Sequence, residues 1–126
     1  MNPANPPRVL VVDDSKVSRT MAVGLLRNRL PQAEFLEAGD GATAIALAAQ
    51  APPDLVVMDF NMPGMSGTDA AQALMSAHPA ARVVLLTANA QSAIQARAEA
   101  LGIELLRKPI KPELADQIAA MLKVSV

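Results

Sequence analysis

Short apolar runs that do not alternate with polar residues constrain this sequence most. Three of them, 9–12 (VLVV), 55–58 (LVVM) and 83–86 (VVLL), are rich in valine and too short to be buried helices. Such runs are typical of strands that are buried on both faces, as in a parallel sheet covered by helices. The longer amphipathic or alanine-rich stretches between them predict helices. The pattern therefore predicts an α/β protein.

The expected elements alternate regularly along the chain. Strands are expected at 9–12, 34–38, 54–59, 83–86 and 103–107. Helices are expected from Ser15 until Pro31 stops the first one, at 42–50, from Ser66 to about Ala77, at 91–101 and from Pro112 onwards. This order predicts a doubly wound, five-stranded parallel sheet with five helices on its two faces. In the first helix, we expect the apolar face to be formed by Val17, Met21, Leu25 and Leu26.

Composition and the chain termini limit the possible functions. With 11 basic and 12 acidic residues, the net charge of -1 gives no electrostatic basis for binding nucleic acid. No apolar run approaches the roughly 18–20 residues of a membrane span, and the N-terminus lacks the apolar segment of a signal peptide. We therefore expect a cytoplasmic protein without membrane association. Residues 1–7, which include three prolines, are expected to form a disordered lead-in to one domain at 8–126.

Polar residues stand at the carboxyl ends of four of the expected strands. Asp13 and Asp14 follow the first strand, Asp59 ends the third, Thr87 follows the fourth and Lys108 follows the fifth. In an open parallel sheet these ends meet at one edge, where ligands bind. Three acids brought together repel one another unless a cation joins them, and Mg²⁺ prefers such oxygen ligands. A carboxylate beside Mg²⁺ and a lysine is arranged to accept a phosphoryl group as a nucleophile.

Each of these residues, taken alone, has a simpler structural explanation. An aspartate after a strand often caps the next helix, and either Asp14 or Ser15 could cap the first helix. A single lysine before a proline is usually a solvated side chain. The coincidence of complementary chemistry at four strand ends favours a shared site over these separate explanations.

The same residues resemble the signature of response regulator receiver domains, the CheY-like family of single-domain chemotaxis regulators. The resemblance lies in 11–15 (VVDDS), 56–67 (VVMDFNMPGMSG), 84–88 (VLLTA) and the Lys108–Pro109 pair, and it extends from Arg8 to the C-terminus. It implies a flavodoxin-like fold. It also implies that Asp59 accepts a phosphoryl group from the phosphohistidine of a sensor histidine kinase or phosphotransfer protein.

The resemblance assigns further roles around the acceptor. Mg²⁺ is the implied cofactor, held by Asp14 and Asp59, by Asp13 through water, and by the backbone carbonyl of Asn61. The other implied roles are phosphoryl contacts by Thr87 and by the backbone of Asn61 and Ala88, pairing of the phosphoryl group with Lys108, and a cis peptide bond before Pro109.

The sequence departs from the family pattern in two places: at Leu105, and between Gly102 and Lys108, a stretch that is one residue shorter than is common. Leu105 stands where receivers usually have the tyrosine or phenylalanine that, together with the threonine equivalent to Thr87, switches the domain. It falls on the face of the fourth helix, fifth strand and fifth helix, where family members usually meet their targets. We expect a stand-alone receiver that signals in trans by protein–protein contact and catalyses only its own phosphoryl transfer and dephosphorylation.

Two alternatives remain open. A scaffold with a receiver fold would act without phosphorylation. The presence of Leu105 in place of the usual aromatic residue supports this interpretation. A small aspartyl-phosphate phosphotransferase would use Asp59 as its nucleophile, but such enzymes usually carry a second acid two residues later. Asn61 occupies that position and cannot act as a general acid.

Overall fold

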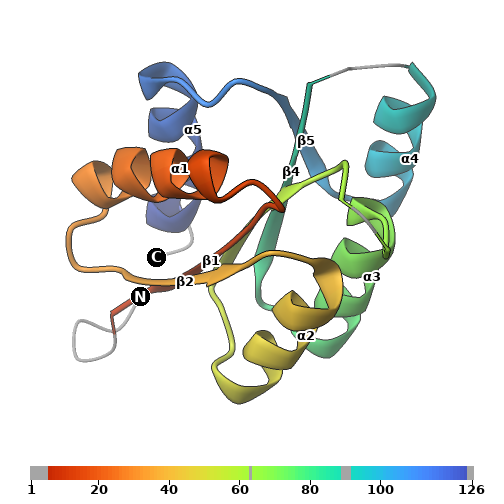
Figure 1. The fold of residues 1–126 in the computed structure, drawn as a ribbon, viewed down its shortest axis with the longest axis horizontal. Helices are drawn as coiled ribbons and strands as arrows, with labels where there is room; N and C mark the ends of the chain where they lie inside the picture. The colour runs from red at the N-terminus through yellow and green to blue at the C-terminus, as the bar shows by residue number, and fades with distance from the viewer. Residues whose placement is uncertain (1–5, 63, 89–91, 125–126) are drawn as a thin grey trace.

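The computed structural model describes residues 6–62, 64–88 and 92–124, and it has the predicted doubly wound architecture (Figure 1). The predicted lead-in falls almost entirely outside the described residues and stays a prediction. The elements are β1 Arg8–Val12, α1 Lys16–Arg29, β2 Glu34–Ala38, α2 Gly41–Gln50, β3 Leu55–Asp59, α3 Gly67–Ala77, β4 Arg82–Thr87, α4 Ser92–Leu101, β5 Glu104–Arg107 and α5 Pro112–Val124.

The five strands form one parallel sheet in the order β2-β1-β3-β4-β5. The order reverses between β1 and β3, which lie side by side at the centre. Val12 pairs with Met58, and Asp59 pairs with Leu86, so β1, β3 and β4 end at nearly the same level. Parallel sheets bind their ligands at such a reversal, beyond the carboxyl ends of the strands.

Helices cover both faces of the sheet. Helices α1 and α5 lie on one face, and α2, α3 and α4 on the other (Figure 1). Residues of β1 point alternately to the two layers: Val9 and Val11 belong to the core under α1 and α5, and Leu10 and Val12 to the core under the other helices. Because both faces are buried, the strand needs apolar residues at every position, which explains its uninterrupted apolar sequence.

The predicted apolar face of α1 is wrong in its first half. Val17 is 70% exposed and Met21 is 57% exposed, whereas Ala22, Val23 and Leu26 are buried. Apolar residues occur around most of this helix, so hydrophobicity alone does not fix its rotation. Packing against the sheet and α5 selects the small Ala22 and its neighbours. Among the described residues, no helix is long and apolar enough to cross a bilayer.

Candidate functional site

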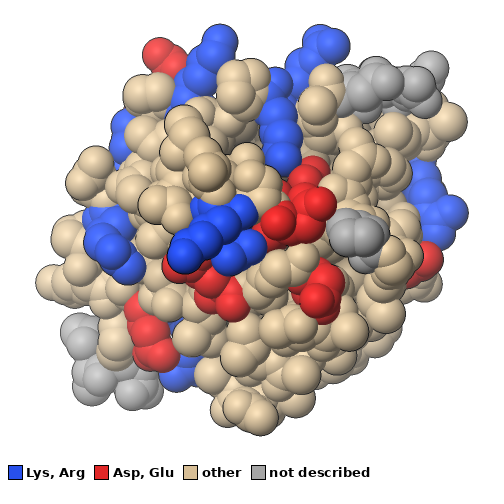
Figure 2. Space-filling model, in the orientation of Figure 1, with Lys and Arg blue, Asp and Glu red and all other residues tan. Residues whose placement is uncertain are grey.

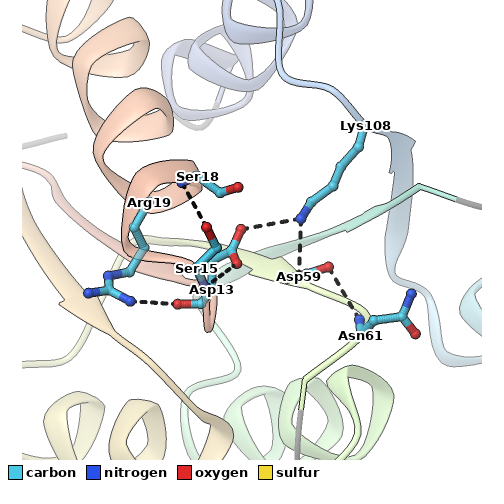
Figure 3. Close-up of polar contacts among 7 residues, drawn as sticks. All are labelled: Asp13, Ser15, Ser18, Arg19, Asp59, Asn61 and Lys108. Atoms are coloured by element: carbon cyan, nitrogen blue, oxygen red, sulfur yellow. Dashed lines mark hydrogen bonds and ion pairs between the residues drawn. The ribbon is translucent and has the colours of Figure 1, made fainter.

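The polar strand ends meet at the carboxyl edge of the sheet (Figure 3). Asp13 directly follows β1 and is 6% exposed, and Asp59, the last residue of β3, is 7% exposed. Asp14 is exposed. Each of these three aspartates offers a carboxylate oxygen, and the three oxygens lie within 4.8 Å of one another. Acidic and basic side chains accordingly gather over this part of the molecule in the space-filling view (Figure 2).

Lys108 bridges two of the three acids. Its Nζ lies 3.2 Å from Asp13 Oδ2 and 3.1 Å from Asp59 Oδ2. The backbone N–H of Lys108 donates to the carbonyl of Thr87 at 2.7 Å, which ties the segment after β5 to the end of β4. The peptide bond between Lys108 and Pro109 is cis, the isomer expected from the sequence.

Asp13 is held by its neighbours at both its side chain and its backbone. Its Oδ1 accepts a hydrogen bond from the Ser15 N–H at 2.9 Å, and its carbonyl oxygen accepts one from Arg19 at 2.7 Å. Ser15, rather than Asp14, caps α1, because the Ser15 hydroxyl accepts from the Ser18 N–H at 3.2 Å. Asp14 is thus not used for capping.

Burial and neighbouring groups shift the pKa of Asp59 in opposite directions, and the same holds for Lys108; the net shift is upward for both residues. Burial raises the pKa of Asp59 above its ordinary value, because the charged form loses water; Lys108 and the Asn61 N–H, which donates to Oδ1 at 3.2 Å, oppose this effect. Burial alone would lower the pKa of Lys108, but Asp59 and Asp13 together outweigh it and raise that pKa. Lys108 is therefore held as a cation beside an incompletely compensated carboxylate.

The segment after β3 returns closely to the end of that strand. The hydroxyl of Ser66, the residue at which the third helix is expected to begin, caps α3 by accepting the Asp69 N–H at 3.2 Å. At Gly67, a Cβ atom would stand 2.8 Å from the carbonyl oxygen of Asp59 and 2.8 Å from the Cα of Phe60. Only glycine allows this approach without displacing the backbone at the end of β3.

The other predicted residues lie around this centre. Thr87 ends β4 and is fully buried, and Ala88 after it is exposed. Asn61 is exposed, with its backbone N–H turned to Asp59. Leu105 pairs with Leu85 in the sheet and packs, half-buried, against the core under α4. It lies on the strand leading to the site and does not belong to the acidic cluster.

Arg19 is the residue that sequence reasoning missed. It extends from α1 to the backbone of Asp13 and also pairs with Glu37 at 3.1 Å. A signal for it existed: a cation near a helix N-terminus is disfavoured by the helix dipole, so an arginine there calls for a specific partner.

The acidic group fits a hard divalent cation. An octahedral Mg²⁺ holds oxygens at about 2.1 Å, so its ligand oxygens lie about 3–4 Å apart. Carboxylate oxygens within 4.8 Å of one another reach this spacing with small side-chain adjustments. The cation would also compensate the negative charge that Lys108 alone leaves in excess.

Comparisons with known proteins give the class of this fold and site. The family model described as response regulator receiver domain matches residues 9–120. The chain belongs to the response regulator receiver family.

Individual relatives support the same assignment. The chain is 35% identical, over 97% of its length, to a protein-glutamate methylesterase/protein-glutamine glutaminase of Myxococcus xanthus, and 37% identical over 99% to the nitrate/nitrite response regulator protein NarP of Escherichia coli. It covers 38% and 59% of those proteins, so it spans only part of the relatives it matches.

Solved structures agree with the fold. Chemotaxis protein CheY4 of Vibrio cholerae superposes with a TM-score of 0.82 at 28% identity, covering 97% of this chain and 100% of that one. The receiver domain of the response regulator NarL of Mycobacterium tuberculosis superposes with a TM-score of 0.81 at 31% identity, covering 96% and 97% of the two chains. Receiver domains bind Mg²⁺ at their acidic site and interact with histidine kinases or phosphotransfer proteins, and this chain has such an acidic group.

Proposed function

We propose that this receiver takes a phosphoryl group onto Asp59 from the phosphohistidine of a sensor kinase or phosphotransfer protein. The observation that carries the proposal is the setting of Asp59: a buried carboxylate at the end of β3, with an ammonium 3.1 Å away and two further carboxylates within 4.8 Å. A simple capping aspartate needs none of these neighbours.

The residues of the chain supply most of the chemistry. A carboxylate oxygen of Asp59 attacks phosphorus, the new O–P bond forms as the P–N bond to the donor imidazole breaks, and the bond's electron pair stays on the imidazole nitrogen. Lys108, already within 3.1 Å of Asp59 Oδ2, pairs with the negative oxygens of the transferred group. Thr87 and the Ala88 amide are proposed to bind those oxygens from the end of β4.

The cation site is proposed to consist of Asp14 and Asp59, with Asp13 acting through water and the Asn61 carbonyl completing the protein ligands. Mg²⁺ bound there supplies positive charge that offsets the repulsion between the acids and the incoming phosphoryl group. Asp14 is suited to this role because it is exposed and caps no helix.

We further propose that output passes through the face of α4, β5 and α5. Leu105 lies on β5, the edge strand of the sheet, and its side chain is half-buried. Changes at the end of the neighbouring strand β4 can therefore alter how this side chain packs. Leucine offers neither an aromatic ring nor a hydroxyl, so its response would be a change in packing. That the domain acts in trans, and has no chemistry beyond its own phosphoryl transfer and loss, stays a prediction.

The alternatives have less support. A phosphorylation-independent scaffold gives no reason to keep two buried aspartates around one lysine, since unpaired buried charge costs stability. A phosphotransferase would need an acid at the position of Asn61, whose backbone, rather than an acidic side chain, is turned to Asp59.

The test is incubation with acetyl phosphate and Mg²⁺, followed by intact-mass spectrometry. The wild type is expected to gain about 80 Da, the mass of one phosphoryl group replacing a proton. Asp59→Asn is expected to gain nothing, because an amide oxygen does not form the acyl phosphate. Omitting Mg²⁺ and adding a chelator is expected to suppress the adduct on the wild type.

Asp40→Asn is the matched control, since Asp40 also follows a strand but caps the next helix. It is expected to be phosphorylated as the wild type is. A folded wild type that gains no mass in the presence of Mg²⁺ would favour the scaffold, and an adduct that persists in Asp59→Asn would place the acceptor elsewhere.

A further inference from the structure

We infer that Arg19 is a positioning residue for the cation site, acting through the backbone of Asp13; this inference rests on the proposed function. Among the described residues, Arg19 makes no hydrogen bond or ion pair with the side chains of Asp13, Asp14 or Asp59. One terminal nitrogen of its guanidinium donates to the carbonyl oxygen of Asp13 at 2.7 Å, and its Nε pairs with Glu37 Oε1 at 3.1 Å (Figure 3 shows the first of these contacts). The arginine thereby joins α1 to the ends of both β1 and β2.

The contact falls on the peptide unit that carries the acidic pair. The carbonyl of Asp13 and the nitrogen of Asp14 belong to one planar peptide, so fixing that carbonyl also fixes the starting point of the Asp14 side chain. Asp14 needs this support, because its exposed carboxylate has no hydrogen bond or ion pair with the other described residues. Asp13, by contrast, is additionally held by Ser15 and Lys108.

The geometry suits an arginine in particular. The rigid fork of a guanidinium can donate to two acceptors in one plane, whereas the single ammonium of a lysine cannot reproduce that arrangement. The side chain of Arg19 is only 17% exposed, so its position is fixed by packing as well as by hydrogen bonds. Groups that orient metal ligands in this way typically change metal affinity by about 10- to 100-fold when they are removed.

A simple charge effect predicts the opposite sign. Arg19 is a cation near three acids, so by charge alone it repels Mg²⁺, and its removal would tighten Mg²⁺ binding. Positioning predicts weaker binding on removal. The direction of the change in Mg²⁺ affinity therefore separates the two roles.

The experiment measures Mg²⁺ binding to the full chain by isothermal titration calorimetry, without any phosphodonor. Arg19→Gln is expected to bind Mg²⁺ about tenfold more weakly than the wild type. Arg19→Lys keeps the charge but loses the fork, and it is also expected to bind more weakly.

Arg29→Gln is the matched control. Arg29 lies on the same helix, donates to a backbone carbonyl (Leu25, 2.8 Å), pairs with an acid (Asp116) and is 21% exposed, but it stands at the other end of α1. It is expected to change the Mg²⁺ affinity less than about twofold, because its charge is screened over that distance.

Unchanged or tighter binding by a folded Arg19→Gln would overturn the inference, as would wild-type affinity in Arg19→Lys. If Arg19→Gln does not fold, the lysine variant decides alone. A wild type that does not bind Mg²⁺ would overturn this inference together with the proposed cation site. Normal binding by the wild type with no effect at Arg19 would overturn the inference alone.

Discussion

The strands β2 and β3 both lead into aspartates, but the two carboxylates have opposite surroundings. Asp40, two residues after β2, is the N-cap of α2, and its Oδ1 accepts the Thr43 N–H at 2.7 Å. This hydrogen bond lowers the pKa of Asp40 below its ordinary value. Asp59 caps no helix, is buried, and has its pKa raised by the loss of water.

The difference comes from where the next helix begins. Helix α2 starts at Gly41, directly after Asp40, so that a free amide of its first turn, the Thr43 N–H, donates to the carboxylate. Helix α3 starts only at Gly67, and Ser66 satisfies its first turn instead. The same type of residue is therefore used for structure at one strand end and left available for chemistry at the other.

The largest expected effect is the loss of stability in Gly67→Ala. This substitution disturbs the close approach of the start of α3 to the end of β3, a feature that distinguishes β3 from β2. The added methyl group would stand 2.8 Å from backbone atoms of Asp59 and Phe60, which cannot move away as a flexible side chain could. The free energy of unfolding is expected to fall by about 3 kcal/mol, the upper range for an overpacked site. Urea unfolding followed by far-ultraviolet circular dichroism measures it, because the chain contains no tryptophan or tyrosine.

Gly24→Ala is the control for this change. Gly24 lies inside α1, and a Cβ there would meet nothing within 4 Å. The substitution is expected to raise the free energy of unfolding by about 0.5–1 kcal/mol through helix propensity. Loss of less than about 0.5 kcal/mol in Gly67→Ala would show that the end of β3 tolerates a wider connection.

A smaller loss of stability is expected from Lys108→Ala. Asp40 is bound by the first turn of a helix, whereas Asp59 is bound by Lys108, and this substitution removes that partner. Asp13 and Asp59 would then face each other without the ammonium that lies 3.2 and 3.1 Å from them. Without metal at neutral pH, the free energy of unfolding is expected to fall by about 1–2 kcal/mol, after allowance for partial solvent screening. Lys111→Ala, an exposed lysine on the same segment, is expected to change it by less than about 0.5 kcal/mol. Equal effects of the two variants would mean that Lys108 does not stabilise the acidic pair.

Much of this arrangement could be predicted from the sequence, because a parallel sheet buried on both faces needs apolar residues throughout its strands. The strands were predicted to within a residue or two, and their order then brought Asp13, Asp59 and Lys108 to one edge. Ser15 was one of two candidates for the cap of the first helix, together with Asp14, and the start of the third helix was expected at Ser66.

What the sequence could not provide depends on three-dimensional packing. The rotation of α1 is set by contacts with the sheet and α5, so that Val17 and Met21 face outwards although they are apolar. The place of Arg19 near a helix N-terminus indicates that it needs a partner, but that partner is the backbone carbonyl of Asp13, which the sequence does not single out. The approach of Gly67 to Asp59 also depends on the path of the intervening loop.

The smallest expected effect concerns pH, and it tests the two aspartates directly. In the metal-free protein the folded-state pKa of Asp59 is raised above its ordinary value of 3.8. Between 3.8 and the folded-state pKa, the folded chain therefore binds more protons than the unfolded chain. This residue's contribution makes wild-type stability fall as pH rises through that window. Relative to wild type, Asp59→Asn should therefore gain stability as pH rises through this window.

The pKa of Asp40 is lowered, so the stability that Asp40 contributes is present above 3.8 and is lost as pH falls through its folded-state pKa. Asp40→Asn should therefore lose stability relative to wild type as pH rises. Urea unfolding in a chelator from about pH 3 to pH 7 measures both differences, and slopes of the same sign would show that the two strand ends are electrostatically alike.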